Sequence, residues 1–113
     1  MRTLFPGRRL GQDAVVILEH ALLTVRLGLE RDFEAAFAEA RPIITGMPGC
    51  RQVSLSRCVE STSTYLLLVE WDRLDDHVEG FRQSPQYEKW KQLLHHFYDP
   101  FPTVEHFEAV IAT

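Results

Sequence analysis

Four short stretches of the chain have the alternation of apolar and polar residues, or the β-branched enrichment, that is typical of β-strands. Strands are predicted over 15–25, 52–59, 64–71 and 103–110. The second stretch alternates most clearly, whereas the first and third are apolar at nearly every position. Strands that are apolar on both faces belong in the centre of a sheet, where both faces are covered.

Two other stretches repeat apolar residues every three or four positions, which predicts amphipathic helices. The first helix is predicted from Glu30 to a Met47-Pro48-Gly49 turn, with a kink or a broken last turn at Pro42. A second helical region is predicted over about 74–82, and it restarts at Ser84-Pro85, where serine caps the helix and proline takes its first position.

The predicted order is β-α-β-β-α-β, which is the ferredoxin-like arrangement of an α+β protein. Its four-stranded antiparallel sheet has the order fourth-first-third-second, so the two strands with two apolar faces occupy the centre. The pattern of the strands and the topology therefore agree.

Both helical crossovers of this topology lie on the same side of the sheet, which leaves the other face uncovered. Exposing that apolar face to water costs about 25 cal/mol per Å². We expect a second copy to cover it, giving a homodimer packed face to face as a dimeric α/β barrel. The competing interpretation is a monomer whose free face binds a different protein.

The composition sets further bounds. With 113 residues the chain is long enough for one domain, which we place at 14–113 after a flexible N-terminal arm over 1–13. The net charge of −4 disfavours nucleic acid as a partner, and no apolar run reaches the roughly 18–20 residues of a membrane span. The N-terminal residues lack the apolar core of a signal peptide, and Cys50 and Cys58 are too far apart along one strand to pair, so a reducing cytoplasm is expected.

The chain from Leu18 to Val110 resembles the antibiotic biosynthesis monooxygenase (ABM) family of the dimeric α/β-barrel superfamily. The stretches that carry the resemblance are the first strand ending at Gly28, Met47-Pro48-Gly49, Leu68-Val69-Glu70-Trp71, the segment 81–90, Phe97-Tyr98-Asp99-Pro100 and Val104-Glu105-His106.

The resemblance implies a dimer with face-to-face sheets and a ligand cleft between the sheet and the helices of one subunit. Several family members oxidise aromatic polyketide intermediates with molecular oxygen and without metal, flavin or haem. Several use an asparagine on the first strand, but this chain contains no asparagine, and that position falls near His20 or Ala21. Haem-degrading relatives carry an iron-binding histidine about where Lys91 stands here, so haem chemistry is not expected.

An oxygenase without a cofactor needs a base that deprotonates a phenol-like substrate, and histidine suits this role near neutral pH. His20 and His106 lie in neighbouring predicted strands. Depending on register, they share one face, or each faces the glutamate of the other strand. A structural Glu–His network and a pocket-lining role both remain open, and no local spacing demands a metal site of His20, His106 and Glu70. His77 either faces the cleft or is a solvated residue among acids.

The second helical region brings together an aromatic set consisting of Trp71, Phe81, Tyr87 and Trp90. These side chains suit core packing, and they also suit the walls of a pocket for an aromatic ligand. Tyr65 and Tyr98 are weaker candidates of the same kind. His95 and His96 are adjacent on a helix and cannot converge on one ligand, so at least one is expected to be exposed.

The sequence thus predicts a cofactor-independent, monooxygenase-like protein that acts on a small aromatic or quinone-like substrate with molecular oxygen. We expect His20, His77 and His106 as catalytic residues, the aromatic set as substrate-binding residues, and no metal or other cofactor. The alternative is a non-catalytic dimeric ligand-binding or stress-associated module of the same fold, which the missing asparagine favours.

Overall fold

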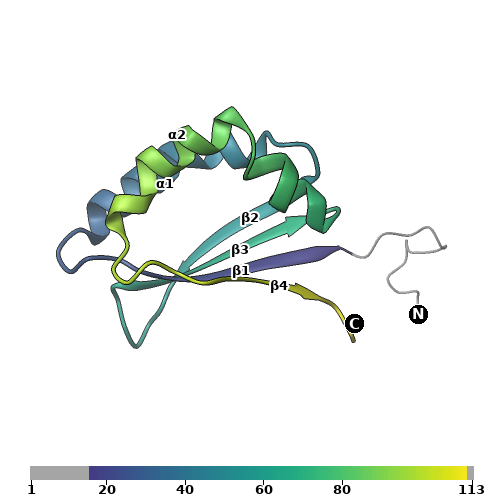
Figure 1. Cartoon of the computed structure of the whole chain (residues 1–113). Coiled ribbons are helices and arrows are strands. Elements are labelled where there is room, and N and C mark those ends of the chain that lie inside the picture. The colour runs from purple at the N-terminus through teal and green to yellow at the C-terminus, as the bar shows by residue number, and fades with distance from the viewer. Residues whose placement is uncertain (1–15, 112–113) are drawn as a thin grey trace.

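The computed structural model describes residues 16–111, and it places all helices on one face of a four-stranded antiparallel sheet (Figure 1). The strands are β1 (Ile17–Thr24), β2 (Cys50–Arg57), β3 (Thr64–Trp71) and β4 (Val104–Glu108). Their order in the sheet is β2-β3-β1-β4, which confirms the predicted ferredoxin-like topology with β1 and β3 in the centre. The predicted N-terminal arm over 1–13 lies outside the described residues.

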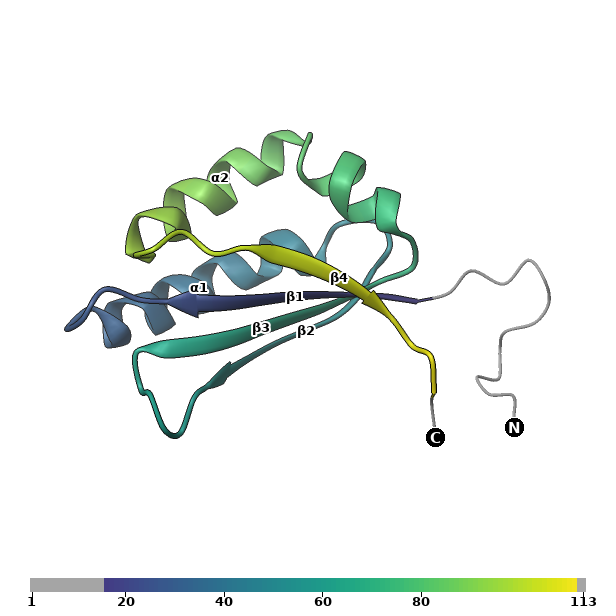
Figure 2. The same ribbon diagram turned by 60° about the horizontal axis from the view of Figure 1, so that its bottom comes forward.

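The helical layer consists of α1 (Glu30–Thr45), the π-helical turn η1 (Asp76–Phe81), α2 (Pro85–Leu94) and the short 3₁₀ turn η2 (His95–Phe97). Figure 2 shows η1 and α2 as two pieces above the β4 side of the sheet. Ser84 caps α2 by accepting a hydrogen bond from the Tyr87 backbone N–H, as predicted. Of the two outcomes expected at Pro42, the broken last turn is wrong, because α1 continues through it to Thr45 and the Pro42 carbonyl accepts a bond from Gly46 N–H.

The core lies between the sheet and the helices. The third strand shows it most simply, because Tyr65, Leu67, Val69 and Trp71 are buried while the residues between them are only half-buried. Phe33, Phe37 and Trp90 meet these side chains from the helices, with Phe33 and Tyr65 ring centroids 4.9 Å apart. This sheet face supports the helices, and it is also the floor of the site described below.

The opposite face of the sheet has no helix over it (Figure 1). Leu22 on β1 is 55% exposed and Phe107 on β4 is 49% exposed. His20 lies on the same face, with its ring centroid 5.5 Å from that of Phe107. We call this surface, defined by His20, Leu22 and Phe107, the open face.

A tight junction fixes η1 against the start of β2. The carbonyl of Gly49 accepts a hydrogen bond from Asp72 N–H at 2.8 Å, and Gly49 has a φ of +85°. A Cβ at this position would stand 2.1 Å from a carboxylate oxygen of Asp76, the first residue of η1. Glycine therefore suits this position both for its backbone angle and for the space it leaves.

Within residues 16–111, no helix has the length and apolar character needed to cross a membrane. Cys50 and Cys58 are both free thiols, as the spacing predicted.

Candidate functional site

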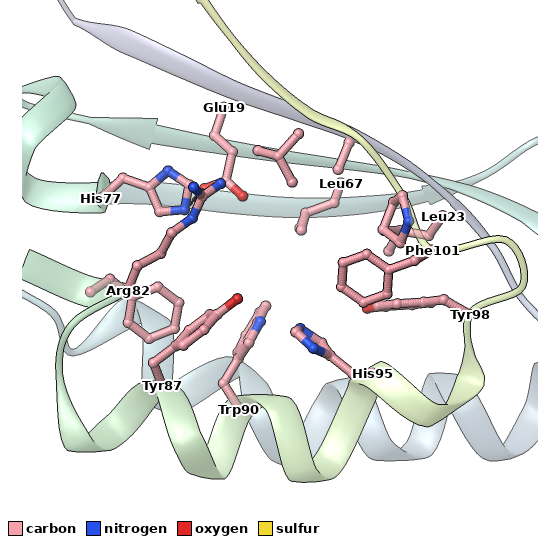
Figure 3. Close-up of a pocket in the computed structure, with 14 residues that line it drawn as sticks. Glu19, Leu23, Leu67, His77, Arg82, Tyr87, Trp90, His95, Tyr98 and Phe101 are labelled. Carbon is pink, nitrogen blue, oxygen red and sulfur yellow. Dashed lines mark ion pairs between the residues drawn. The ribbon is translucent and has the colours of Figure 1, made fainter. Parts of the chain in front are cut away.

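A cavity of about 430 Å³ lies between the helix-facing side of the sheet and the α2 region (Figure 3). This size is within the range of sites for small organic ligands. The lining residues come from β1, β3, η1, α2, η2, the start of β4 and the segments next to these elements: Glu19, Ala21, Leu23, Leu67, His77, Phe81, Arg82, Tyr87, Trp90, His95, Tyr98, Phe101, Pro102 and Val104.

One wall of the cavity is aromatic. The Phe81 ring meets Tyr87 and Trp90 edge to face, with centroid distances of 5.2 and 5.6 Å. Phe81 and Trp90 are almost fully buried, whereas Tyr87 is half-buried at the cavity. The floor opposite is formed by small and aliphatic side chains of the sheet, including Ala21 and Leu67. A flat aromatic ligand can stack between these two surfaces.

The polar end of the cavity is built around Glu19, which is buried in the middle of β1. Its Oε1 accepts a hydrogen bond from the indole Nε1 of Trp71 at 2.9 Å. The Nε2 atom of His77 stands 3.4 Å from the same oxygen. The polar contacts of the described residues leave Glu19 Oε2 without a protein partner, and Glu19 lines the cavity.

His77 is held in place from three sides. Its ring stacks on Trp71 at a centroid distance of 5.3 Å and an interplanar angle of 16°. Phe81 flanks it at 6.4 Å and 30°. Its Nδ1 atom lies 2.8 Å from Nε2 of His106, which projects from the edge strand β4. The imidazole thus contacts Glu19 through one nitrogen and His106 through the other.

The π-helical geometry of η1 explains why His77 reaches the sheet. The backbone N–H of Arg82 bonds to the carbonyl of His77 at 3.0 Å, a five-residue step wider than that of an α-helix. His77 and Phe81 are the two buried residues of this turn. Isolated π-helical turns occur frequently at functional sites.

Burial dominates the protonation of this end. Desolvation raises the pKa of Glu19, although the bond from Trp71 and the charge of Arg82 oppose the rise. Desolvation, followed by the charge of Arg82 and the nearby His106, lowers the pKa of His77 from 6.5 to about 3. Desolvation and Arg82 also lower the pKa of His106. Both imidazoles are therefore neutral at physiological pH, and as the pH falls Glu19 takes up a proton before His77 does.

Arg82 places a positive charge beside this group. Figure 3 shows its side chain extending along the cavity toward His77 and Glu19. A guanidinium group is always charged at physiological pH and offers five N–H donors. It can bind an anionic oxygen of a ligand whose ring lies against the aromatic wall.

The other end of the cavity is formed by His95, Tyr98 and Phe101 (Figure 3). The His95 ring stands 4.9 Å from Phe101 and 6.0 Å from Tyr98. Burial raises the pKa of Tyr98 and lowers that of His95. This end therefore offers uncharged hydrogen-bonding groups, in contrast to the polar end at Glu19.

Comparison with known proteins agrees with this architecture. The family model described as "Antibiotic biosynthesis monooxygenase" matches residues 16–93, more than two thirds of the chain. The chain belongs to this family. A Bordetella bronchiseptica protein assigned to the same family has a crystal structure with a TM-score of 0.82 and 37% identity, covering 86% of this chain and 99% of that one.

Two further proteins are similar to this chain, one in sequence and one in fold. The Bacillus subtilis protein YczJ, which is uncharacterized, is 58% identical over 95 residues, covering 84% of this chain and all of YczJ. SnoaB of Streptomyces nogalater, a cofactor-independent oxygenase, matches with a TM-score of 0.68 and 20% identity, covering 88% of this chain and 96% of SnoaB. At that identity the likeness to SnoaB shows the fold alone.

Most of the residues predicted for an ABM site lie in or beside the cavity. His77, Phe81, Tyr87 and Trp90 line it. Trp71 and His106 are not in the lining, and they act on it through Glu19 and His77. Of the two registers left open, the observed one pairs Glu19 with His106 and His20 with Glu105.

His20 does not reach the cavity, because neighbouring residues of a strand point to opposite faces. It lies on the open face against Phe107, so this register separates it from His106. Of the adjacent pair on η2, His95 lines the cavity and His96 is exposed, as expected.

Three polar residues that line the cavity were not among the site residues expected from the sequence: Glu19, Arg82 and His95. Glu19 could have been found from the sequence. It alternates in step with Ala21 and Leu23, which places a carboxylate on the inward side of an apolar strand. Arg82 gave no such signal in the sequence, because the direction of its side chain depends on the π-helical turn. Among the described residues, no group of three or more His, Cys, Asp or Glu side chains is arranged to hold a metal ion.

Proposed function

We propose that this protein is a cofactor-independent, monooxygenase-like enzyme that oxidises a small aromatic or quinone-like substrate with molecular oxygen. The observation that carries the proposal is the cavity itself, with an aromatic wall facing an aliphatic floor and with Glu19, His77 and Arg82 at one end. Membership of the ABM family supports it, as does the shared fold with SnoaB, a cofactor-independent oxygenase.

The chemistry begins with removal of a proton from a phenol-type or hydroquinone-type substrate. The carboxylate of Glu19 accepts this proton, and its raised pKa brings it closer to that of the substrate. Arg82 stabilises the resulting anion. The electron-rich anion then reduces molecular oxygen to superoxide by one electron, and the substrate radical and superoxide combine to a peroxide anion. This anion takes up a proton to become a hydroperoxide. Loss of the hydrogen on the same carbon, with cleavage of the O–O bond, then releases water and leaves a carbonyl group on the product.

The aromatic wall positions the substrate for this reaction. Phe81, Tyr87 and Trp90 restrict the ligand to the plane between the wall and the sheet. Such positioning holds the reacting carbon near the polar end. A substrate with a second oxygen function can use Tyr98 and His95 at the far end.

The open face supports a homodimer in which two sheets pack against each other. Leu22 and Phe107 remain about half exposed in the single chain, and a second copy of the same face is complementary to them by symmetry. We also propose a cytoplasmic location, which is compatible with the free thiols of Cys50 and Cys58.

Oxygen uptake with hydroxyanthrone and hydroquinone probes tests the proposal. Glu19→Gln keeps the shape of the side chain and removes the base, so it should lower kcat by about 10²–10⁴. His96→Gln, on the exposed side of η2, is the matched control and should retain the native rate.

Tight binding of these probes without oxygen uptake would support a ligand-binding module in place of an enzyme. If the native protein neither binds the probes nor consumes oxygen with them, the proposed function is wrong.

A further inference from the structure

We propose that Glu19, His77 and His106 form a proton relay that connects the cavity with the surface at β4. The inference rests on the proposed function, because it explains how a proton that the buried Glu19 takes from the substrate leaves the site and returns to it. His106 does not line the cavity, so it cannot contact a ligand bound there. Its position beyond His77 therefore requires another explanation.

Successive groups of the relay lie within 3.4 Å of one another. Glu19 faces the cavity, and its Oε1 is 3.4 Å from Nε2 of His77. The other nitrogen of His77, Nδ1, is 2.8 Å from Nε2 of His106. His77 thus contacts Glu19 through Nε2 and His106 through Nδ1. His106 contacts His77 through Nε2, which leaves its Nδ1 for water.

Neutral imidazole rings suit this arrangement, because each carries one N–H donor and one lone pair. When Glu19 has taken the substrate's proton, the electron pair of the broken O–H bond stays on the substrate. Glu19 passes the proton to Nε2 of His77, Nδ1–H of His77 passes to Nε2 of His106, and Nδ1–H of His106 passes to water. Both rings end in the opposite tautomer, and the reverse sequence returns a proton to the peroxide and restores the start.

The outer end of the relay lies at an edge of the sheet. β4 pairs only with β1 in the described sheet, and His106 on it is half-buried, unlike the almost fully buried His77. Water can therefore exchange a proton with His106. The inner part is held rigidly, since Trp71 bonds to Glu19 and stacks on His77.

Glu19 is the end of the relay at the cavity. Arg82 is the charged side chain that lies beside the relay. Arg82 lies close enough to lower the pKa of both His77 and His106. Its positive charge disfavours a resting imidazolium at either ring. A proton passes along the chain, in consequence, without being trapped on it.

The first experiment measures oxygen uptake by His106→Ala with the hydroxyanthrone probe, in buffers with and without imidazole. We expect kcat to fall at least about tenfold with KM nearly unchanged, and added imidazole to restore it through the space left at β4. His106→Gln retains a hydrogen bond to His77 but cannot exchange one ring proton for another, so it should be equally slow and not rescued.

A purely structural role for His106 predicts the reverse, with Gln restoring the rate and imidazole without effect. That result would overturn the relay. His96→Ala is the control, and its rate of oxygen uptake should equal that of the native protein with and without imidazole.

The second experiment needs no turnover. Nitrogen-15 NMR of the histidine side chains follows exchange of the His77 ring proton with solvent in the native protein and in His106→Phe, which keeps a ring at β4. We expect exchange to slow at least about tenfold in the variant. Equal exchange rates would overturn the relay. An absence of oxygen uptake by the native protein would overturn the proposed function instead, and the exchange rates would still decide this inference.

Discussion

The indole Nε1 of Trp71 donates a hydrogen bond to Oε1 of Glu19 over 2.9 Å, and both side chains are buried between the sheet and η1. A buried carboxyl group without a donor is costly, because it has lost its water and gained nothing in exchange. This bond therefore stabilises the domain and also holds in place a carboxylate that lines the cavity.

Replacing Trp71 by Phe should lower the free energy of unfolding by about 2–4 kcal/mol, since a buried acceptor loses its donor and a cavity opens. Urea denaturation measures the change. Trp90→Phe is the matched control, because Trp90 is also buried and no bond from its indole nitrogen is formed among the described residues. Equal losses in the two variants would show that packing alone is at work.

The pH dependence of stability should report the burial of His77. Its pKa falls from 6.5 to about 3 on folding, so the unfolded chain binds this proton more readily than the folded one. The stability contributed by neutral His77 is complete above pH 6.5 and is lost as the pH falls from 6.5 toward 3. Glu19 has the opposite sign, because its pKa is raised in the folded state.

His77→Phe keeps a ring against Trp71 and has no proton to bind. Compared with this variant, the native protein should lose unfolding free energy progressively below pH 6.5, and the difference between the two should be constant at higher pH. Chemical denaturation at a series of pH values measures it, with His96→Phe as the control. A difference that does not change with pH would contradict the buried, neutral state of His77.

The proposed dimer predicts that a charge on the open face disrupts assembly. Leu22→Glu should raise the dimer dissociation constant at least about 100-fold, because two leucine side chains are lost from one symmetric interface. Sedimentation equilibrium measures the constant. Leu27→Glu, in the loop after β1 where Leu27 is 89% exposed, is the control and should not change assembly. A native protein that is monomeric at all concentrations would refute the dimer.

The junction at Gly49 should tolerate substitution poorly. Gly49→Ala places a Cβ against the Asp76 side chain at a φ of +85°, so we expect a loss of about 1–3 kcal/mol in thermal or urea unfolding. Gly28→Ala separates the two causes, because Gly28 has a φ of +91° with no atom within 4 Å of the added Cβ. If both variants lose the same amount, backbone strain alone accounts for the effect.

The sequence predicted the fold well, because strand periodicity and two-sided apolar strands are local patterns that follow directly from burial. Strand β3 over 64–71 and the sheet order match the expectation in full. The break at Pro42 was wrong, since one missing backbone donor in an exposed turn does not outweigh the packing of α1.

The site was harder to predict, because side-chain direction depends on register and on helix type. The sequence alone left two registers for β1 and β4, and only the observed pairing separates His20 from His106. Likewise, the π-helical turn that turns His77 inward and brings Arg82 to the cavity has no reliable sequence signal. Phe81, Tyr87 and Trp90 were expected near the ligand because these aromatic residues cluster around the second helical region of the sequence.

The alternation of β1 divides its residues between two duties. Odd-numbered positions such as Glu19 and Ala21 line the cavity on one side of the sheet, and even-numbered positions such as His20 and Leu22 form the opposite surface. The effect of a substitution in this strand should therefore depend on whether the position is odd or even, so that adjacent residues are under different constraints. A substitution at position 19 should alter the cavity, whereas a substitution at position 20 should alter the open face.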